Sequence, residues 1–194
     1  MSSRERILAA VKANQPELTE LPEVNIPQSN DNLVERFATI ATTIGGKVFE
    51  ITAVEEIKSL ISEQFNSTAR IITSLAELSD IAETEISQIN PHDLENVDLA
   101  ILSGEIAVAE NGAIWVPEAN TMQRVLPFIT QHLALVVHKS MLVATMHQAY
   151  EIIGERDYGY SAFIAGPSKT ADIEQSLVLG AHGPRSLMVF LVGE

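Results

Sequence analysis

A glycine turn near the C-terminus, Gly166-Pro167-Ser168-Lys169-Thr170, follows an apolar run and precedes a stretch with helical spacing. A helix N-terminus, the Lys169 ammonium and the hydroxyls of Ser168 and Thr170 can together hold a phosphate or a carboxylate. The second glycine of a Walker A loop is missing, so this turn is not that motif. The alternative is that Ser168 or Thr170 only caps the helix, with acidic residues of the first turn satisfying its dipole.

A second glycine turn, residues 180–185, contains His182 between Gly180 and Gly183, followed by Arg185. A histidine close to an arginine in such a turn can bind a carboxylate or move a proton. The alternative is a loop histidine that hydrogen-bonds only to the backbone. We expect both turns to form one anion pocket, because Lys169 and Arg185 are the strongest donors available there.

Glu110 and Arg124 complete the set of candidate site residues. Glu110 follows an apolar run and stands beside Asn111-Gly112, a turn dipeptide, where a partly desolvated carboxylate can act as a general base. The alternative is a turn carboxylate in water. Arg124 is the first basic residue after a long stretch without one, and it either binds substrate or pairs with acidic neighbours.

The sequence predicts no cofactor and no metal site. The histidines have neither the spacing of a helical metal site nor the H-E-x-x-H motif, and the chain has no cysteine to supply thiolates to an iron–sulfur cluster. No G-x-G-x-x-G follows a strand, so we expect no bound flavin or NAD.

The composition is that of a folded and strongly acidic protein. The formal net charge is −14, from 12 basic and 26 acidic residues, which argues against nucleic-acid binding and against an anionic membrane surface. No Lys or Arg occurs between Ile71 and Gln123, a segment that is either a solvated acidic face or a docking face for a basic partner. Apolar runs are too short to span a membrane, the N-terminus does not resemble a signal peptide, and we expect a cytoplasmic protein.

Helices and strands alternate along the chain. Helical spacing predicts helices over residues 3–13 and 32–43, from Thr52 onward, and over 141–154 and 171–179. Alternating or continuously apolar runs predict strands at residues 47–51, 69–73, 97–102, 133–137, 160–165 and 186–192, and two more on either side of Asn111-Gly112. Residues 74–96 read as short helix and loop.

This alternation predicts a three-layer α/β/α architecture with a mostly parallel sheet. We expect residues 1–30 to form an N-terminal helix and an extended connector, and residues 31–194 to form a single α/β domain. Sites in such sheets lie beyond the carboxyl ends of the strands. The turns after Ala165 and around Glu110 should therefore meet at one end of the sheet.

Three segments together resemble one family. The run of 26 residues from Gly166 to Leu191 looks like the C-terminal signature of the LUD-domain proteins, specifically the lactate-utilisation protein C group. Residues 109–113, Ala-Glu-Asn-Gly-Ala, resemble the family's Ala-Glu-Thr-Gly segment, with Asn111 where threonine is usual. Arg124, Leu126-Pro127 and His132 resemble a third block.

The resemblance implies the fold of ribose-5-phosphate isomerase, glucosamine-6-phosphate deaminase and the CoA transferases. It also implies a role in bacterial growth on L-lactate through oxidation to pyruvate, beside two iron–sulfur partners, the A-type and B-type lactate-utilisation proteins. Within such a system the chain is a catalyst, a ligand-binding subunit or an assembly factor. The alternative is a stand-alone enzyme or a sensor that acts on a small carboxylate or sugar phosphate.

Overall fold

The structure is a computed structural model that describes residues 2–20, 22, 32–173 and 176–193. Five strands form a central parallel sheet in the order β1-β11-β6-β3-β2. Their bounds are β1 Lys47–Ile51, β2 Ile71–Thr73, β3 Leu99–Ser103, β6 His132–His138 and β11 Ser186–Val192. The longest continuously apolar runs occupy β3, β6 and β11, as expected for strands that are buried on both faces.

A second, four-stranded sheet packs against the first in the order β7-β4-β5-β8. Its strands are β4 Ile106–Val108, β5 Ala113–Pro117, β7 Leu142–Val143 and β8 Ser161–Ile164. The pairs β4–β5 and β5–β8 are antiparallel, while β4 and β7 are parallel. The expected architecture, α/β with a mostly parallel central sheet, is confirmed, and this smaller sheet is an addition that the alternation pattern did not predict.

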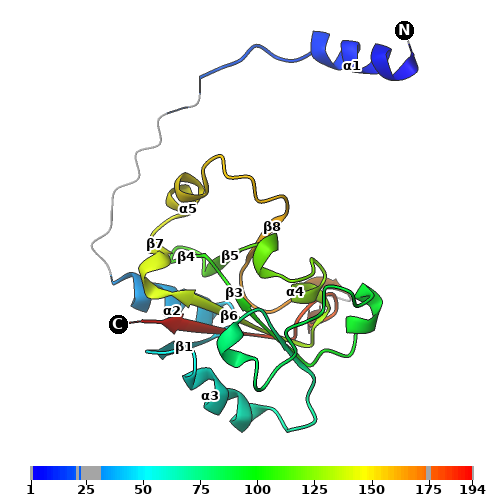
Figure 1. The fold of residues 1–194 in the computed structure, drawn as a ribbon. Helices are drawn as coiled ribbons and strands as arrows, with labels where there is room; N and C mark the ends of the chain where they lie inside the picture. Colours follow the sequence, from blue (N-terminus) through cyan, green and yellow to red (C-terminus); the bar gives the residue numbers. More distant parts are fainter. Residues whose placement is uncertain (1, 21, 23–31, 174–175, 194) are drawn as a thin grey trace.

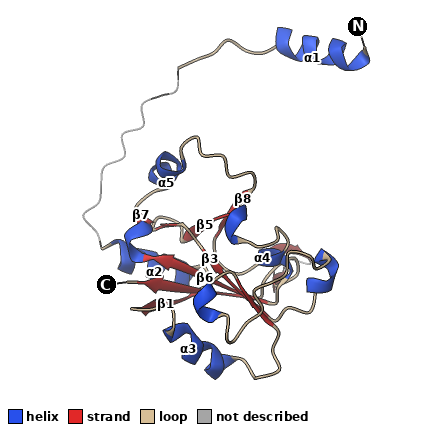
Figure 2. Ribbon diagram, in the orientation of Figure 1, coloured by secondary structure: helices blue, strands red, loops and turns tan. Residues whose placement is uncertain are grey.

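Helices pack against these sheets, except for α1, which lies apart from both of them (Figures 1 and 2). They are α1 Ser3–Ala13, α2 Leu33–Thr43, α3 Glu56–Gln64, α4 Leu126–Ile129 and α5 Met146–Ile153, with 3₁₀ turns at Ala76–Leu78, Pro91–Leu94, Glu118–Asn120 and Lys139–Met141. Helix α3 packs on one face of the central sheet through Ile57 and Ile61. Helix α5 packs on the outer face of the small sheet through Ala149 and Ile153.

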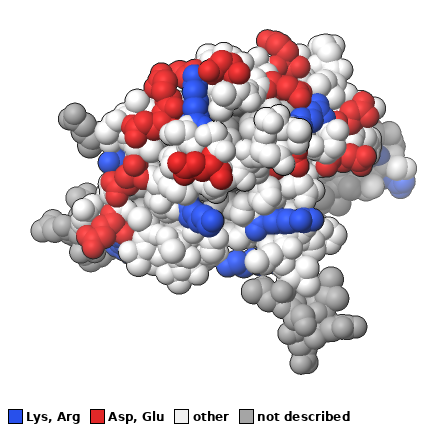
Figure 3. All heavy atoms as spheres, turned by 90° about the horizontal axis from the view of Figure 1, so that it is seen from below, with Lys and Arg blue, Asp and Glu red and all other residues white. Residues whose placement is uncertain are grey.

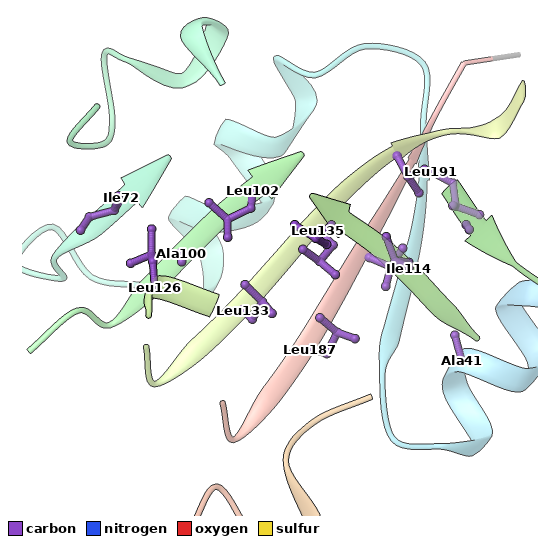
Figure 4. Packing of buried hydrophobic residues seen from close by; sticks show 14 of the residues in the cluster. Ala41, Ile72, Ala100, Leu102, Ile114, Leu126, Leu133, Leu135, Leu187 and Leu191 are labelled. Carbon is purple, nitrogen blue, oxygen red and sulfur yellow. The ribbon is translucent and has the colours of Figure 1, made fainter. Parts of the chain in front are cut away.

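The main hydrophobic core lies between the two sheets. Leu133, Leu135 and Leu187 of the central sheet meet Ile114 of β5 and Ala41 of α2 there, as Figure 4 shows. Burial of this apolar surface is the main force that holds the small sheet on the large one. The stacking also brings loops of both sheets together at one edge, where the candidate site lies.

The N-terminal helix α1 has none of its residues buried, and Ile7, Leu8 and Val11 are exposed. Its N-cap is Ser2, which forms a capping box with Glu5. The expected connector, residues 15–32, falls largely outside the described residues. Across the part of the chain that the structure describes, no helix is both long and apolar enough to cross a lipid bilayer.

Two local predictions need correction. Residues 141–145 form a 3₁₀ turn and β7 instead of the first turn of a helix, and α5 begins at Met146 behind its N-cap Thr145. The helix predicted from Thr52 onward begins later, at Glu56, and the Thr52 hydroxyl donates to the carboxylate of Glu56, 2.5 Å away.

Candidate functional site

The turn after β8 is fixed by its first residue, Gly166. Its φ of +71° is a conformation that favours glycine, and a Cβ added there would lie 2.9 Å from the Ile44 carbonyl oxygen at the end of α2. The Nζ of Lys169 donates a hydrogen bond to the same carbonyl. The turn is therefore clamped to the end of α2 from both sides.

The helix predicted for residues 171–179 is wrong. The chain instead forms an antiparallel hairpin of β9, Lys169–Ile173, and β10, Ser176–Leu179, with Lys169 opposite Leu179 and Thr170 opposite Val178. No helix N-terminus stands at Ser168, so the helix dipole cannot contribute to anion binding there. Any anion would have to be held by side chains and by the backbone of the turn.

The two glycine turns meet at Ser168, as the sequence predicted. The Ser168 N–H donates to the Pro184 carbonyl (2.9 Å), and the Gly180 N–H donates to the Ser168 carbonyl (3.1 Å). A Cβ on Gly183 would lie 3.1 Å from the Ser168 Cβ, so the second turn passes close over the first. These contacts bring His182 to the same place as Ser168.

A pocket of about 220 Å³ opens where the turns meet. Its lining comes from α4, from the starts of β6 and β11, from the end of β8 and from both turns, and comprises Pro127, Phe128, Leu133, Phe163, Ile164, Ala165, Gly166, Pro167, Ser168, His182, Gly183, Pro184 and Leu187. The pocket lies at the carboxyl end of β8 but at the amino ends of β6 and β11. The expectation of a site beyond the carboxyl ends of one parallel sheet therefore needs correction, since β8 belongs to the second sheet.

The remaining cations of the two turns lie outside this lining. Lys169 is exposed and engaged with Ile44, and Thr170 is paired in the hairpin. The Arg185 N–H donates to the Gln131 carbonyl (2.8 Å), while its exposed side chain packs on Gly180. Of the five residues predicted in these turns, the structure brings Ser168 and His182 together in the pocket.

Glu110 lies at the same end of the small sheet as Gly166, because Ile114 of β5 pairs with Ile164 of β8. The predicted meeting of the two turns is thus confirmed for the backbone. The Glu110 carboxylate, however, accepts a hydrogen bond from the Met146 N–H (3.0 Å), the first amide of α5. A carboxylate at a helix N-terminus satisfies an otherwise unpaired donor, so Glu110 stabilises α5 in this structure.

Arg124 pairs with Glu118 and not with the pocket. Its Nε and Nη2 lie 2.6 and 2.8 Å from the two carboxylate oxygens, and its guanidinium stands over the Tyr160 ring. Hydrogen bonding to Arg124 lowers the pKa of Glu118 below its ordinary value. This pair links the 3₁₀ turn after β5 to the start of β8, because Glu118 also accepts from the Tyr160 N–H.

The pocket contains aromatic and proline residues that the sequence analysis did not select. Phe128 is 41% exposed at the mouth, directly after the Leu126-Pro127 pair of the third family-like block. The feature of the sequence that could have pointed to this pocket is an aromatic residue, Phe128, directly after Pro127. A separate polar contact lies nearby, where His132 Nδ1 is 2.7 Å from Ser186 Oγ; burial, and secondarily the charge of Arg185, lowers the His132 pKa.

Comparison with known proteins places these segments in a family. The family model described as "LUD domain" matches residues 72–192, which include the small sheet, the central sheet apart from β1 and the first residue of β2, and all the lining of the pocket. The chain belongs to the LUD domain family. The pocket therefore lies within the part of the chain that matches the LUD domain.

Relatives of this LUD domain protein include two named Lactate utilization protein C. One, from Shouchella clausii, is 35% identical over 105 residues, which cover 52% of this chain and 46% of the relative. The other, from Halalkalibacterium halodurans, is 27% identical over 208 residues and covers 93% of this chain and 88% of the relative. In the first alignment the chain spans less than half of the relative's length.

A solved structure of similar fold is that of a DUF162 family protein from Deinococcus radiodurans. It superposes with a TM-score of 0.64 at 19% identity, over 86% of this chain and 100% of that chain. This likeness supports the α/β fold described above.

Proposed function

We propose that this protein is a non-redox LUD-domain subunit of a bacterial L-lactate utilisation system, acting in the cytoplasm. The observation that carries the proposal is the pocket between the two glycine turns, built from the family-like signature segment and containing Ser168 and His182. The names of the relatives from Shouchella clausii and Halalkalibacterium halodurans point to the same system.

The proposed partners are iron–sulfur lactate-utilisation proteins of the A and B types, which would carry electrons from lactate as it is oxidised to pyruvate. This chain contains no cysteine, so it has no thiolate with which to hold a cluster. In this proposal it binds the carboxylate of substrate or product, and its partners perform the redox step.

Within the pocket, we assign carboxylate binding to the Ser168 hydroxyl and the His182 ring, which also can carry a proton. Arg185, the last residue of the second turn, lies outside the lining and supplies positive charge near the rim. Lys169, Thr170, Glu110 and Arg124 support this site from outside, by holding the first turn, α5 and the start of β8 in position.

A second candidate is a stand-alone enzyme or sensor for a small carboxylate or phosphate. It is favoured by the lining of the pocket, where the Ser168 hydroxyl and the His182 ring are both available to a small anion. A bound ligand would then change the protein's own activity or state, without any need for iron–sulfur partners.

Growth on L-lactate distinguishes the two candidates. In a host that carries the system, deletion of this gene should abolish growth on L-lactate but not on pyruvate, and the wild-type gene should restore it. We expect His182→Ala and Ser168→Ala to fail to restore growth, while His92→Ala, which changes a histidine that lies outside the pocket lining, restores it fully. Normal growth of the deletion strain on L-lactate would contradict the proposed role.

A further inference from the structure

The floor of the pocket is made of apolar residues. Leu133 and Leu187, at 1% and 2% exposure, stand opposite each other at the starts of β6 and β11. Figure 4 shows their side chains next to each other at this end of the sheet. Pro127, Pro167 and Pro184 are buried around them. The side chains of this floor offer a ligand only hydrocarbon groups.

The mouth of the pocket combines aromatic and polar groups. Phe128 and Ile164 are among its lining residues, while the ring of Phe163 lies near that of Tyr150 of α5, on the outer face of the small sheet. Among the described residues of the lining, only Ser168 and His182 have polar atoms in their side chains. The pocket therefore has one polar site, at the rim, and one apolar space behind it, which is the general pattern of small-molecule sites.

This division fits a particular kind of carboxylate. Lactate has a single methyl group as its apolar part, so it would fill little of a pocket of about 220 Å³. A branched or aromatic side chain would fill more of the pocket and remove more of the ligand's own apolar surface from water, which is favourable in proportion to the apolar area buried. A sugar phosphate would place hydroxyls against the floor without hydrogen-bond partners, which is costly.

We propose that this pocket binds 2-hydroxy monocarboxylates with a branched aliphatic or aromatic side chain more tightly than it binds lactate. The proposal rests on the proposed carboxylate site and names its substrate class. The side chain of the ligand lies on Leu133 and Leu187, under the ring of Phe128. Its carboxylate accepts hydrogen bonds from the Ser168 hydroxyl and a ring N–H of His182 at the rim.

Calorimetry on the full chain tests the proposal with four probes: L-lactate, 2-hydroxyisocaproate, phenyllactate and the neutral amide of phenyllactate. We expect phenyllactate and 2-hydroxyisocaproate to bind at least about tenfold more tightly than lactate. The amide should bind about tenfold more weakly than phenyllactate, because it lacks the charge that the rim recognises.

Two variants locate the binding. Phe128→Ala should weaken phenyllactate about fivefold and leave lactate within about twofold, since it removes only apolar contact. The matched control is Tyr158→Ala, an aromatic of similar exposure, 38% against 41%, that packs on Trp115 away from the pocket. Ala165→Phe changes an exposed residue of the mouth, so it should fold normally and exclude the bulky probes.

The outcomes separate this inference from the function on which it rests. If lactate binds as tightly as phenyllactate and His182→Ala abolishes both, the carboxylate site stands and the substrate class is wrong. If none of the probes binds, the proposed carboxylate site itself is wrong. Tight binding of phenyllactate that neither Phe128→Ala nor Ala165→Phe weakens would place the ligand elsewhere and overturn the inference.

Discussion

Replacing Gly166 with alanine should both destabilise the protein and disturb the pocket. The backbone there has φ +71°, which costs an L-residue about 1–2 kcal/mol. Reduced freedom of the unfolded chain returns about 0.4–1 kcal/mol. The new Cβ would also lie 2.9 Å from the Ile44 carbonyl oxygen, closer than van der Waals contact.

That contact cannot be relieved cheaply. The Ile44 carbonyl accepts the Lys169 hydrogen bond, so moving it away strains a second link between α2 and the turn. We expect a total loss of roughly 2–3 kcal/mol in the free energy of unfolding. With a urea m-value of about 2 kcal/mol/M, the midpoint of denaturation should fall by about 1 M. Because the turn carries Ser168, ligand affinity should fall as well.

Gly154→Ala is the matched control for this experiment. Gly154 also has positive φ, +53°, but the nearest atom to an added Cβ is 3.7 Å away, at the Glu151 carbonyl. The Gly154→Ala substitution therefore introduces backbone strain at the end of α5 but no clash with a neighbouring atom. Ligand affinity should not change in this variant. Urea denaturation of Gly166→Ala that matches the wild type within about 0.5 kcal/mol would refute the argument that this turn is clamped to α2.

Three further predictions concern parts of the chain outside the pocket. Deletion of residues 1–31 should leave the urea midpoint unchanged, because no residue of α1 is buried; a large drop would show that the N-terminal segment is part of the domain. Burial lowers the folded-state pKa of His132, so the unfolded chain binds its proton more readily and stability is lost as the pH falls through that pKa, below about 6.5. His132→Gln should therefore flatten the dependence of the urea midpoint on pH between about 7.5 and 5.5, and an unchanged slope would be contrary to this. Arg124→Gln should leave carboxylate affinity within about twofold, as titration calorimetry can check, because the guanidinium is engaged with Glu118; a tenfold loss would mean that Arg124 reaches the ligand.

The sequence predicted the central sheet well because its strands are buried on both faces. Runs such as Leu133–Val137 and Leu187–Val192 are continuously apolar, and this pattern is typical of parallel strands. The small sheet was harder to predict. The strands of the small sheet are short, and β7 has only two residues. The formation of this sheet therefore depends on its packing against the large sheet more than on the local sequence pattern.

The hairpin of β9 and β10 shows where local pattern misleads. Residues 171–179 combine helical spacing with acidic residues where a first helical turn would be, which indicates a helix. The structure instead closes this segment by hydrogen bonds from Ser168 and Gly180. These contacts join the two glycine turns on either side of the segment, and pairing of this kind overrides helix propensity.

The candidate site was predicted in part. Ser168 and His182 meet because the two glycine turns meet, and glycine turns are visible in a sequence. The roles of Lys169, Glu110 and Arg124 were not visible, because each side chain pairs with a group that only the fold brings near: the Ile44 carbonyl, the Met146 amide and the Glu118 carboxylate.

The most direct test of the central claim is a crystal structure of the protein soaked with L-lactate. We expect density for the carboxylate within hydrogen-bond distance of the Ser168 hydroxyl and the His182 ring, in the pocket floored by Leu133 and Leu187. Ligand density at another place in the domain, with this pocket holding only water, would contradict it.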